Sequence, residues 1–202
     1  MYCEKSREEF ELKSNKAKLG KKIVDGAYST MIEKIDNGDI PNFFYLNYSL
    51  QDYKVNNLII IPKHYFTKEI IIKRQPLSKT ARRAGWVGSN IDVSSIPDSG
   101  KLYLIKDGQE EKKNIIIDKF NKMLFLRKSK SVLRCWLLDI LKCIEMLDKK
   151  EFTLNEVYSF EVFLKIKHPE NNNIQAKIRQ QLQILRDYRY LSFTKRGKYK
   201  LL

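Results

Sequence analysis

The chain has 202 residues, 43% of them hydrophobic, which is enough for one mid-sized domain or two small ones and excludes a largely disordered protein. Its net charge of +15, from 39 basic and 24 acidic residues, suggests a polyanionic partner; the alternative is a basic protein without one. No apolar run approaches 18 residues and the three cysteines are widely spaced, so we expect a cytoplasmic protein without a membrane span or a disulfide scaffold.

A short strand is predicted near the start of the chain, over residues 9–14. Side chains alternate along a strand, so Phe10 and Leu12 face one way, and Glu11 and Lys13 face the other, about 7 Å apart. A carboxylate next to an ammonium is typical of metal-dependent phosphodiesterases, where one binds the ion and the other acts on the attacking water or the phosphate. Glu-x-Lys is also the second half of the PD-(D/E)XK nuclease signature. A solvent-exposed strand edge is the commoner source of such a pair.

A basic loop follows over residues 15–22, and a helix is predicted from Asp25-Gly26 to about Ile35, ended by residues 37–39. We expect Asp25 to be the N-cap of this helix rather than a metal ligand.

Strands are predicted next, over residues 43–48, 56–62, 65–66 and 70–72. The second of these is a continuous apolar run, which is typical of a buried strand. A helix followed by several core strands favours an α/β domain with a mixed central sheet.

Residues 76–92 have little periodicity but contain two adjacent arginines, Arg82 and Arg83, and a tryptophan, Trp86, close to two glycines. Arginine beside an aromatic side chain suits contact with phosphates and bases. A surface loop whose tryptophan packs into the core is an equally good interpretation.

A hairpin is predicted over residues 102–109 and a helix over residues 118–126. The chain then becomes basic and polar, and we place a domain boundary at residue 129, which gives domains 1–129 and 130–202.

The second domain is predicted to begin with an amphipathic helix over residues 136–147. Thr153 and Glu156 have the spacing of a capping box, which would open a second helix to about Leu164. A third helix is predicted over residues 173–187, with an apolar face formed by Ile174, Ile178, Leu182 and Leu185.

The opposite face of the third helix contains the residue types that recognise base edges in the major groove. After it, a strand, a turn and a return strand contain five basic residues and no acidic residue from position 188 onward. Three helices and a basic hairpin predict a winged helix-turn-helix domain; one used for protein contacts is the alternative. The predicted DNA-binding residues of the whole chain are Arg82, Arg83, Trp86, Asn172, Lys177, Arg179, Gln180, Gln183, Lys195, Arg196 and Lys198.

The chain resembles the Dam-replacing family of methyl-directed type II restriction endonucleases over nearly its whole length. The stretches that carry the resemblance are residues 8–14 (EEFELKS), 25–28 (DGAY), 41–44 (PNFF), 80–86 (TARRAGW), 124–129 (LFLRKS) and 177–187 (KIRQQLQILRD). The resemblance implies an α/β PD-(D/E)XK nuclease domain followed by a winged helix, both binding double-stranded DNA with N6-methyladenine in G-A-T-C. It also implies that Glu11 is a catalytic, Mg²⁺-binding carboxylate and that Lys13 is the catalytic lysine.

The chain departs from the family pattern at its N-terminal end. In the family the catalytic Asp lies a few residues before the position of Cys3, and two CxxC pairs bind zinc. Here only Cys3 matches one of these cysteines, its partner position is Ser6, and the zinc site is therefore incomplete. We expect an N-terminally truncated member with little or no cleavage, for which Glu8 and Glu9 are the nearest substitute carboxylates.

Two functions remain open at this stage, with a third as a weaker alternative. The chain is a monomeric methylation-dependent endonuclease or a fragment of one, or it is a nuclease-dead binder of methylated DNA. A winged-helix transcription regulator would require Glu11 and Lys13 to be accidental.

Overall fold

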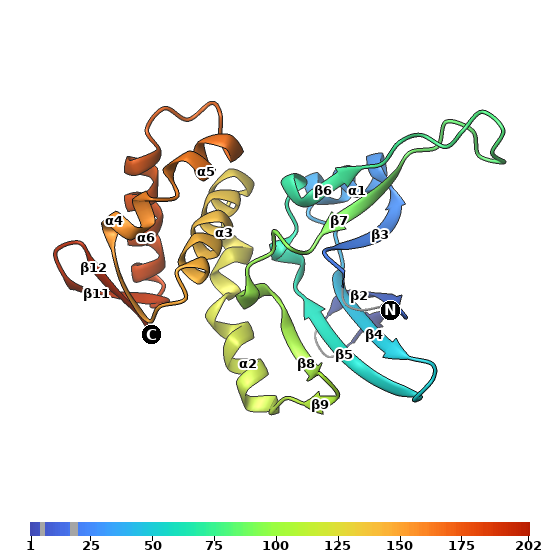
Figure 1. The fold of residues 1–202 in the computed structure, drawn as a ribbon, viewed down its shortest axis with the longest axis horizontal. Coiled ribbons are helices and arrows are strands. Elements are labelled where there is room, and N and C mark those ends of the chain that lie inside the picture. The colour runs from blue at the N-terminus through green and yellow to red at the C-terminus, as the bar shows by residue number, and fades with distance from the viewer. Residues whose placement is uncertain (5–6, 17–19) are drawn as a thin grey trace. The chain divides into compact units, whose positions relative to one another are not determined.

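The computed structural model describes residues 1–4, 7–16 and 20–202. They form two compact units, residues 1–121 and 122–202. The first unit is α/β, and the second consists of helices with a small sheet (Figure 1). The predicted fold class, an α/β nuclease-like domain followed by a winged helix, is confirmed.

A six-stranded mixed sheet forms the centre of the first unit. Its strand order is β1-β2-β4-β5-β8-β9, in which β2 and β4 are parallel and all other neighbours are antiparallel. The strands are β1 (Tyr2–Cys3), β2 (Glu8–Asn15), β4 (Asn42–Ser49), β5 (Lys54–Ile61), β8 (Leu102–Lys106) and β9 (Gln109–Glu110). The strands predicted over residues 9–14, 43–48 and 56–62 and the hairpin over residues 102–109 are therefore confirmed.

A second, three-stranded antiparallel sheet has the order β3-β7-β6. Its strands are β3 (Lys22–Ala27), β7 (Gly88–Asp92) and β6 (Ile71–Lys73). Helix α1 (Tyr28–Asn37) packs on this sheet through the buried Met31 and Ile35. Gly38 ends the helix with φ +76°, a conformation that glycine adopts without steric cost, and its N–H donates to Ile35 O at 3.3 Å.

Short helical segments connect the strands of the first unit, and two predictions about them need correction. The segment at Tyr65 is not a strand but a 3₁₀ turn that follows Pro62, because the Tyr65 N–H donates to Pro62 O at 3.0 Å. The helix predicted over residues 118–126 lies earlier in the chain. The segments are η1 (Lys63–Tyr65), η2 (Lys68–Ile70), η3 (Asp98–Gly100) and α2 (Lys113–Lys122), which ends at the boundary between the units; η4 (Leu124–Lys128) belongs to the second unit.

The second unit has the order helix, strand, helices, hairpin. Its elements are α3 (Ser131–Met146), β10 (Glu151–Thr153), α4 (Leu154–Tyr158), α5 (Glu161–Lys167), α6 (Ile174–Asp187), β11 (Leu191–Lys195) and β12 (Lys198–Leu201). The sheet has the order β10-β12-β11. The apolar face predicted for the third helix is buried throughout, with Ile178, Leu182 and Leu185 fully inaccessible. This arrangement confirms the winged helix.

The capping box is confirmed, but the long helix that it was expected to open is not. The Thr153 hydroxyl accepts from the Glu156 N–H, and the Glu156 carboxylate accepts from the Thr153 N–H at 2.7 Å. The helix ends after Tyr158, where the Ser159 hydroxyl donates to Glu156 O at 2.7 Å and the Phe160 N–H turns back to Val157 O. A serine that bonds to a backbone carbonyl competes with helix continuation, so α4 and α5 are separate.

Candidate active site and nucleic-acid interface

Three charged side chains meet between the two sheets of the first unit. The Lys13 ammonium forms ion pairs with both Glu11 and Asp25. Lys13 and Asp25 are largely buried, with side chains 18% and 10% exposed, whereas Glu11 is 42% exposed. Lys13 also lies 5.7 Å from the centre of the Phe43 ring. The predicted Glu-x-Lys pair thus forms part of a carboxylate–lysine–carboxylate cluster.

The cluster exists because β2 and β3 belong to different sheets that meet here. Side chains alternate between the two faces along β2, so Glu11 and Lys13 lie on the same face. Asp25 belongs to β3, the first strand of the second sheet in the sequence. The prediction that Asp25 caps the following helix is therefore wrong: the N-cap is Ala27, which has no side-chain hydrogen bond to the helix. A cavity of about 130 Å³ adjoins Glu11 and Asp25 and is open to solvent.

Lys13 is held in its charged form. Burial on its own lowers the pKa of this ammonium, but the hydrogen bonds to Asp25 and Glu11 and their negative charges raise the pKa above its usual value. Lys13 is therefore protonated at neutral pH. It can stabilise negative charge on a phosphate, but in this arrangement it cannot accept a proton from water.

The two other carboxylates near the cluster do not join it. Glu8 accepts a hydrogen bond from Asn42 Nδ2 at 3.1 Å and pairs with Lys63 at 2.9 Å. Glu9 is exposed and lies opposite Tyr2 in the β1–β2 pair.

The residues present fit a magnesium ion only in part. Mg²⁺ takes hard oxygen ligands and is commonly held by one or two carboxylates and several waters, which Glu11 and Asp25 could provide. The single Lys13 ammonium pairs with both carboxylates, so the cluster keeps only one net negative charge for a cation. Among the described residues, no group of three or more His, Cys, Asp or Glu side chains has the geometry of a metal site. Cys3 is half-buried, and Ser6, its zinc partner position, lies outside the described residues.

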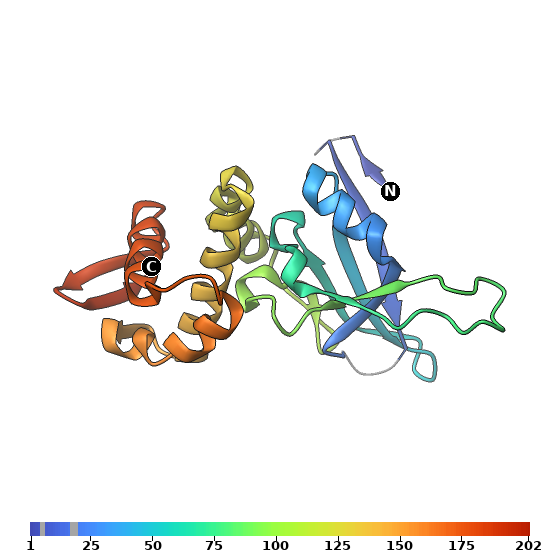
Figure 2. The same ribbon diagram turned by 90° about the horizontal axis from the view of Figure 1, so that it is seen from above.

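A projecting arm, residues 74–87, connects β6 with β7 and extends away from the sheets (Figures 1 and 2). Its two sides are paired by backbone hydrogen bonds, among them Arg74 N–H to Gly88 O at 3.0 Å and Leu77 N–H to Trp86 O at 2.9 Å. The arm contains four basic residues and no acidic one. It is therefore a cationic hairpin-like extension rather than an unstructured loop.

The predicted contact residues of the arm are Arg82, Arg83 and, closer to β7, Trp86. Arg82 and Arg83 are exposed, and the Arg83 guanidinium lies 5.0 Å from the centre of the Trp86 ring. Trp86 is half-buried and does not belong to the buried core. Its ring packs on Gly88, where an added Cβ would lie 2.8 Å from the ring carbons. The absence of a side chain at Gly88 therefore leaves room for the indole ring.

Helix α6 presents an exposed reading face, defined here as Arg179, Gln180, Gln183 and Arg186. Arg179 Nη1 donates to the Tyr158 hydroxyl of α4. Arg186 pairs with Asp187 at 2.8 Å and lies 4.7 Å from the centre of the Phe193 ring. Lys177, which was predicted to contact DNA, is half-buried above the Trp136 ring at 5.8 Å. The arginines are thus held in position by the domain itself.

Lys165, which no sequence motif identifies, holds the loop before α6 through three hydrogen bonds. Its ammonium donates to Pro169 O, Asn171 O and Asn172 Oδ1 at 2.9–3.0 Å. Asn172, a predicted DNA contact, is exposed but already accepts one of these bonds. Nothing in the local sequence marks Lys165, because its partners come from a loop whose path only the fold determines.

A second positioning cluster lies between α3 and the end of α5. Asp139 forms an ion pair with Lys167 and a hydrogen bond with His168, whose Nε2 lies 2.8 Å from Asp139 Oδ2. The His168 ring stacks on Trp136 with the ring centres 3.7 Å apart. These partners are 28 and 29 residues apart in the sequence, so no motif identifies them.

The predicted wing is formed by β11, β12 and the turn between them. Lys195, Arg196 and Lys198 are exposed at or beside this turn. They form a basic edge at the tip of the wing, and basic side chains at such a position suit contacts with DNA phosphates.

Comparison with protein families identifies both halves of the chain. Residues 1–129 match the Dam-replacing family (DpnI), and residues 132–201 match the Dam-replacing HTH domain. In the described part of the chain, no helix has the length and apolar character needed to cross a membrane. The first match alone covers more than half of the chain, and the second agrees with the winged helix of the structure. The chain therefore belongs to the Dam-replacing family, a family of methylation-dependent restriction endonucleases with a C-terminal DNA-binding HTH domain.

Proposed function

We propose that this chain binds double-stranded DNA containing N6-methyladenine in G-A-T-C, and that its first unit is the magnesium-dependent nuclease half of the activity. The observation that carries the proposal is the combination of an exposed Arg/Gln reading face on α6 with a basic wing in a member of this family. Arginine pairs with guanine and glutamine with adenine in the major groove, whereas the wing lysines bind phosphates of any sequence.

The arm supports the preference for methylated DNA. Each N6-methyl group adds apolar surface in the major groove, and burying one is worth about 0.8 kcal/mol. Trp86 offers an apolar ring, and Arg82 and Arg83 offer phosphate contacts beside it. Two methyl groups in a symmetric site would double the gain, which produces a clear preference between methylated and unmethylated DNA.

The Glu11–Lys13–Asp25 cluster is proposed as the protein's contribution to phosphodiester cleavage. Glu11, which is the most exposed of the three, would hold the ion, and Asp25 would orient Lys13. Bound magnesium would stabilise negative charge on the phosphate and activate water. Lys13, protonated because of its two partners, would hold the phosphate oxygen next to it.

One geometric feature favours a second carboxylate from a neighbouring strand. In the β1–β2 pair, Met1 and Phe10 exchange two backbone hydrogen bonds of 2.7 and 2.8 Å. In a longer chain, the position directly before Met1 would thus face Glu11 as a non-hydrogen-bonded pair, in which the Cα atoms are about 4.5 Å apart. An Asp there would meet Glu11 across the strands, as the family resemblance implies.

A nuclease-dead binder of methylated DNA is the second candidate function. The observation in its favour is that Lys13 pairs with both carboxylates, which reduces the net charge of the cluster from −2 to −1. Without a further carboxylate, the cluster attracts a divalent cation weakly.

The test compares three proteins on fully methylated plasmid with magnesium: the 202-residue chain, a version with Met-Asp added before Met1, and the same extended version with Glu11→Ala. We expect slow or undetectable cleavage by the first, specific fragments from the second, and none from the third. Methylated-duplex binding by all three with no cleavage by the extended chain would favour the nuclease-dead binder. Equal cleavage by the second and third proteins would contradict the role of Glu11.

A further inference from the structure

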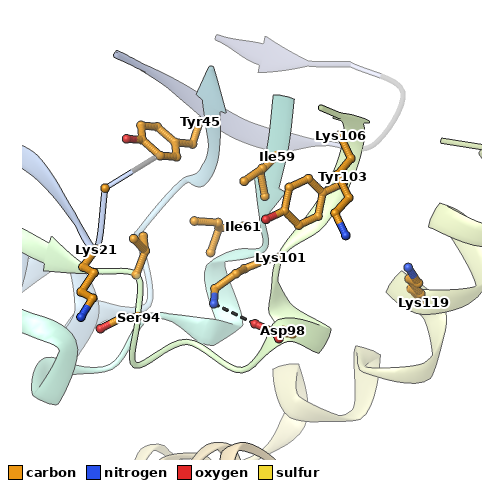
Figure 3. Close-up of a pocket in the computed structure, with 12 residues that line it drawn as sticks. Lys21, Tyr45, Ile59, Ile61, Ser94, Asp98, Lys101, Tyr103, Lys106 and Lys119 are labelled. Atoms are coloured by element: carbon orange, nitrogen blue, oxygen red, sulfur yellow. Dashed lines mark hydrogen bonds and ion pairs between the residues drawn. The ribbon is translucent and has the colours of Figure 1, made fainter. Parts of the chain in front are cut away.

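A second, larger cavity lies on the main sheet of the first unit, away from the arm. Its volume is about 370 Å³, which is within the range of small-molecule sites. Ile59 and Ile61 of β5 form its floor, and Tyr103 of β8 stands beside them with its hydroxyl towards the centre (Figure 3). The two isoleucines are 1–2% exposed, so core packing fixes the floor, and the more exposed Tyr103 ring is the apolar surface that a ligand can contact.

Four lysines line this cavity: Lys21, Lys101, Lys106 and Lys119. Its single lining carboxylate belongs to Asp98, whose side chain is 76% exposed and pairs with Lys101 at 2.9 Å. In the described parts of the chain, the other three lysines form no ion pair with a carboxylate. The cavity therefore carries an excess of three positive charges, which favours an anionic ligand.

The Tyr103 ring at the side of the cavity favours a ligand that also has a flat, apolar part. Burial, together with the nearby charges of Asp98 and Asp107, raises the pKa of Tyr103, so its hydroxyl remains a hydrogen-bond donor at neutral pH. The Lys106 ammonium lies 5.4 Å from the centre of the Tyr103 ring. An aromatic ring over an apolar floor suits a flat heterocycle, since every nucleic-acid base can stack on such a ring. A bare anion would leave this surface unused.

The strand register places the cavity on the same sheet face as the candidate active site. Lys13 pairs with Tyr45, Tyr45 with Ile59, and Ile59 with Tyr103. Residues paired across neighbouring strands point to the same face, and three strand spacings correspond to about 14 Å. The cavity thus lies on the same face of the sheet as Glu11 and Lys13, about three strands away from them.

We propose that this cavity binds a nucleoside monophosphate unit, with its phosphate among the lysines and its base against the Tyr103 ring above Ile59 and Ile61. The unit comes either from a free nucleotide or from a terminal nucleotide of a DNA strand. This site is separate from the reading face and the arm, and it does not depend on the methyl preference proposed above.

The test uses the full 202-residue chain and isothermal titration with 2′-deoxyadenosine 5′-monophosphate, deoxyadenosine and inorganic phosphate. We expect the monophosphate to bind at least tenfold more tightly than either part alone. Lys106→Ala/Lys119→Ala and Tyr103→Ala should each weaken binding at least tenfold, whereas Tyr103→Phe, which keeps the ring, should change it less than threefold. Lys113→Ala, an exposed lysine of the same helix as Lys119, should leave it unchanged.

Several results would overturn the proposal: no heat of binding at 10 mM monophosphate, equal affinity for deoxyadenosine, or an equal loss in Lys113→Ala. A 5′-phosphorylated trinucleotide distinguishes the sources, because tighter binding than the mononucleotide indicates a DNA end and weaker binding a free nucleotide. Duplex binding by the Lys106→Ala/Lys119→Ala variant is measured in parallel. Those lysines lie outside the reading face and the arm. If the chain does not bind the nucleotide but still binds the duplex, only the proposal about the cavity is wrong, and the proposed DNA-binding function stands.

Discussion

At the scale of single residues, Lys13 determines the state of the candidate active site. One ammonium forms ion pairs with two carboxylates, and the Asp25 side chain is only 10% exposed. Removal of the ammonium would leave this carboxylate charged and without its ion partner in a poorly solvated position. The same contacts that keep Lys13 charged therefore also stabilise the first unit.

Lys13→Met should lower the free energy of unfolding by about 1–3 kcal/mol. Removing one partner of a fully buried ion pair costs about 3–5 kcal/mol, and the cost is smaller here because the site is partly solvated. Adding Asp25→Asn should recover at least about 1 kcal/mol, since the two residues interact directly. Urea unfolding of the single and double variants measures both values. Lys68→Met, which breaks the exposed pair with Asp36, should cost less than about 1 kcal/mol, and strict additivity of Lys13→Met and Asp25→Asn would contradict the coupling.

Glu156 gives the second unit a pH dependence. The hydrogen bond from Lys149, followed by those from the Thr153 N–H and hydroxyl, lowers the pKa of Glu156 from 4.5 to about 2. Because the folded pKa is below the unfolded one, this stabilisation is complete above pH 4.5 and is lost as the pH falls towards about 2.

Glu156→Gln should therefore flatten the decline of stability between pH 5 and pH 2.5. Urea unfolding followed by Trp136 fluorescence in a Trp86→Phe background reports on the second unit, because Trp136 is 4% exposed in its core. Glu170→Gln, in an exposed loop of the same unit, should keep the slope of the parent protein. An unchanged slope in Glu156→Gln would contradict the role of the capping box.

At the scale of elements, the proposed function gives α6 and the wing different tasks. Arg179 is held by Tyr158 at the reading face, so Arg179→Ala should cost about 1–3 kcal/mol of DNA-binding free energy and relax the sequence preference. Lys198→Ala should weaken binding to all sequences equally and reduce the salt slope by about one. Lys200→Ala, whose ammonium pairs with Glu151 at 3.0 Å, should have a smaller effect.

Fluorescence anisotropy with labelled duplexes at several salt concentrations measures these three variants. The assignment of tasks fails if Arg179→Ala weakens binding uniformly across sequences, or if Lys198→Ala alters the sequence preference.

The elements with a strong local pattern could be predicted from the sequence. Helix α6 has a strict apolar period, and β5 ends in the apolar run LIII before Pro62, so the predicted bounds of both are close to the observed ones. The capping box at Thr153 was found because its two hydrogen bonds involve residues three apart.

The elements that depend on distant partners could not be predicted. Strand β10 has three residues and exists through its pairing with β12, more than 40 residues away. Asp25 precedes a glycine and a helical pattern, and this position favours an N-cap. In the structure Asp25 pairs with Ser89 in the β3–β7 sheet, and its side chain forms an ion pair with Lys13. For the candidate site, the sequence therefore identified Glu11 and Lys13 but not the third member of the cluster.

At the scale of the whole molecule, the family membership and the two units give a protein that joins a nuclease-like domain to a DNA-reading domain. Net positive charge occurs in both units, which suits contact with one polyanion by both. The central claim is that this binding depends on adenine methylation.

The most direct test is the affinity of the full chain for a duplex with one fully methylated G-A-T-C site, compared with the same duplex without methyl groups, at a fixed salt concentration. Burial of two methyl groups at about 0.8 kcal/mol each predicts a preference of about tenfold for the methylated duplex. Trp86→Ala should reduce this preference while the affinity for the unmethylated duplex changes little. Equal affinity of the parent chain for the two duplexes would contradict the account.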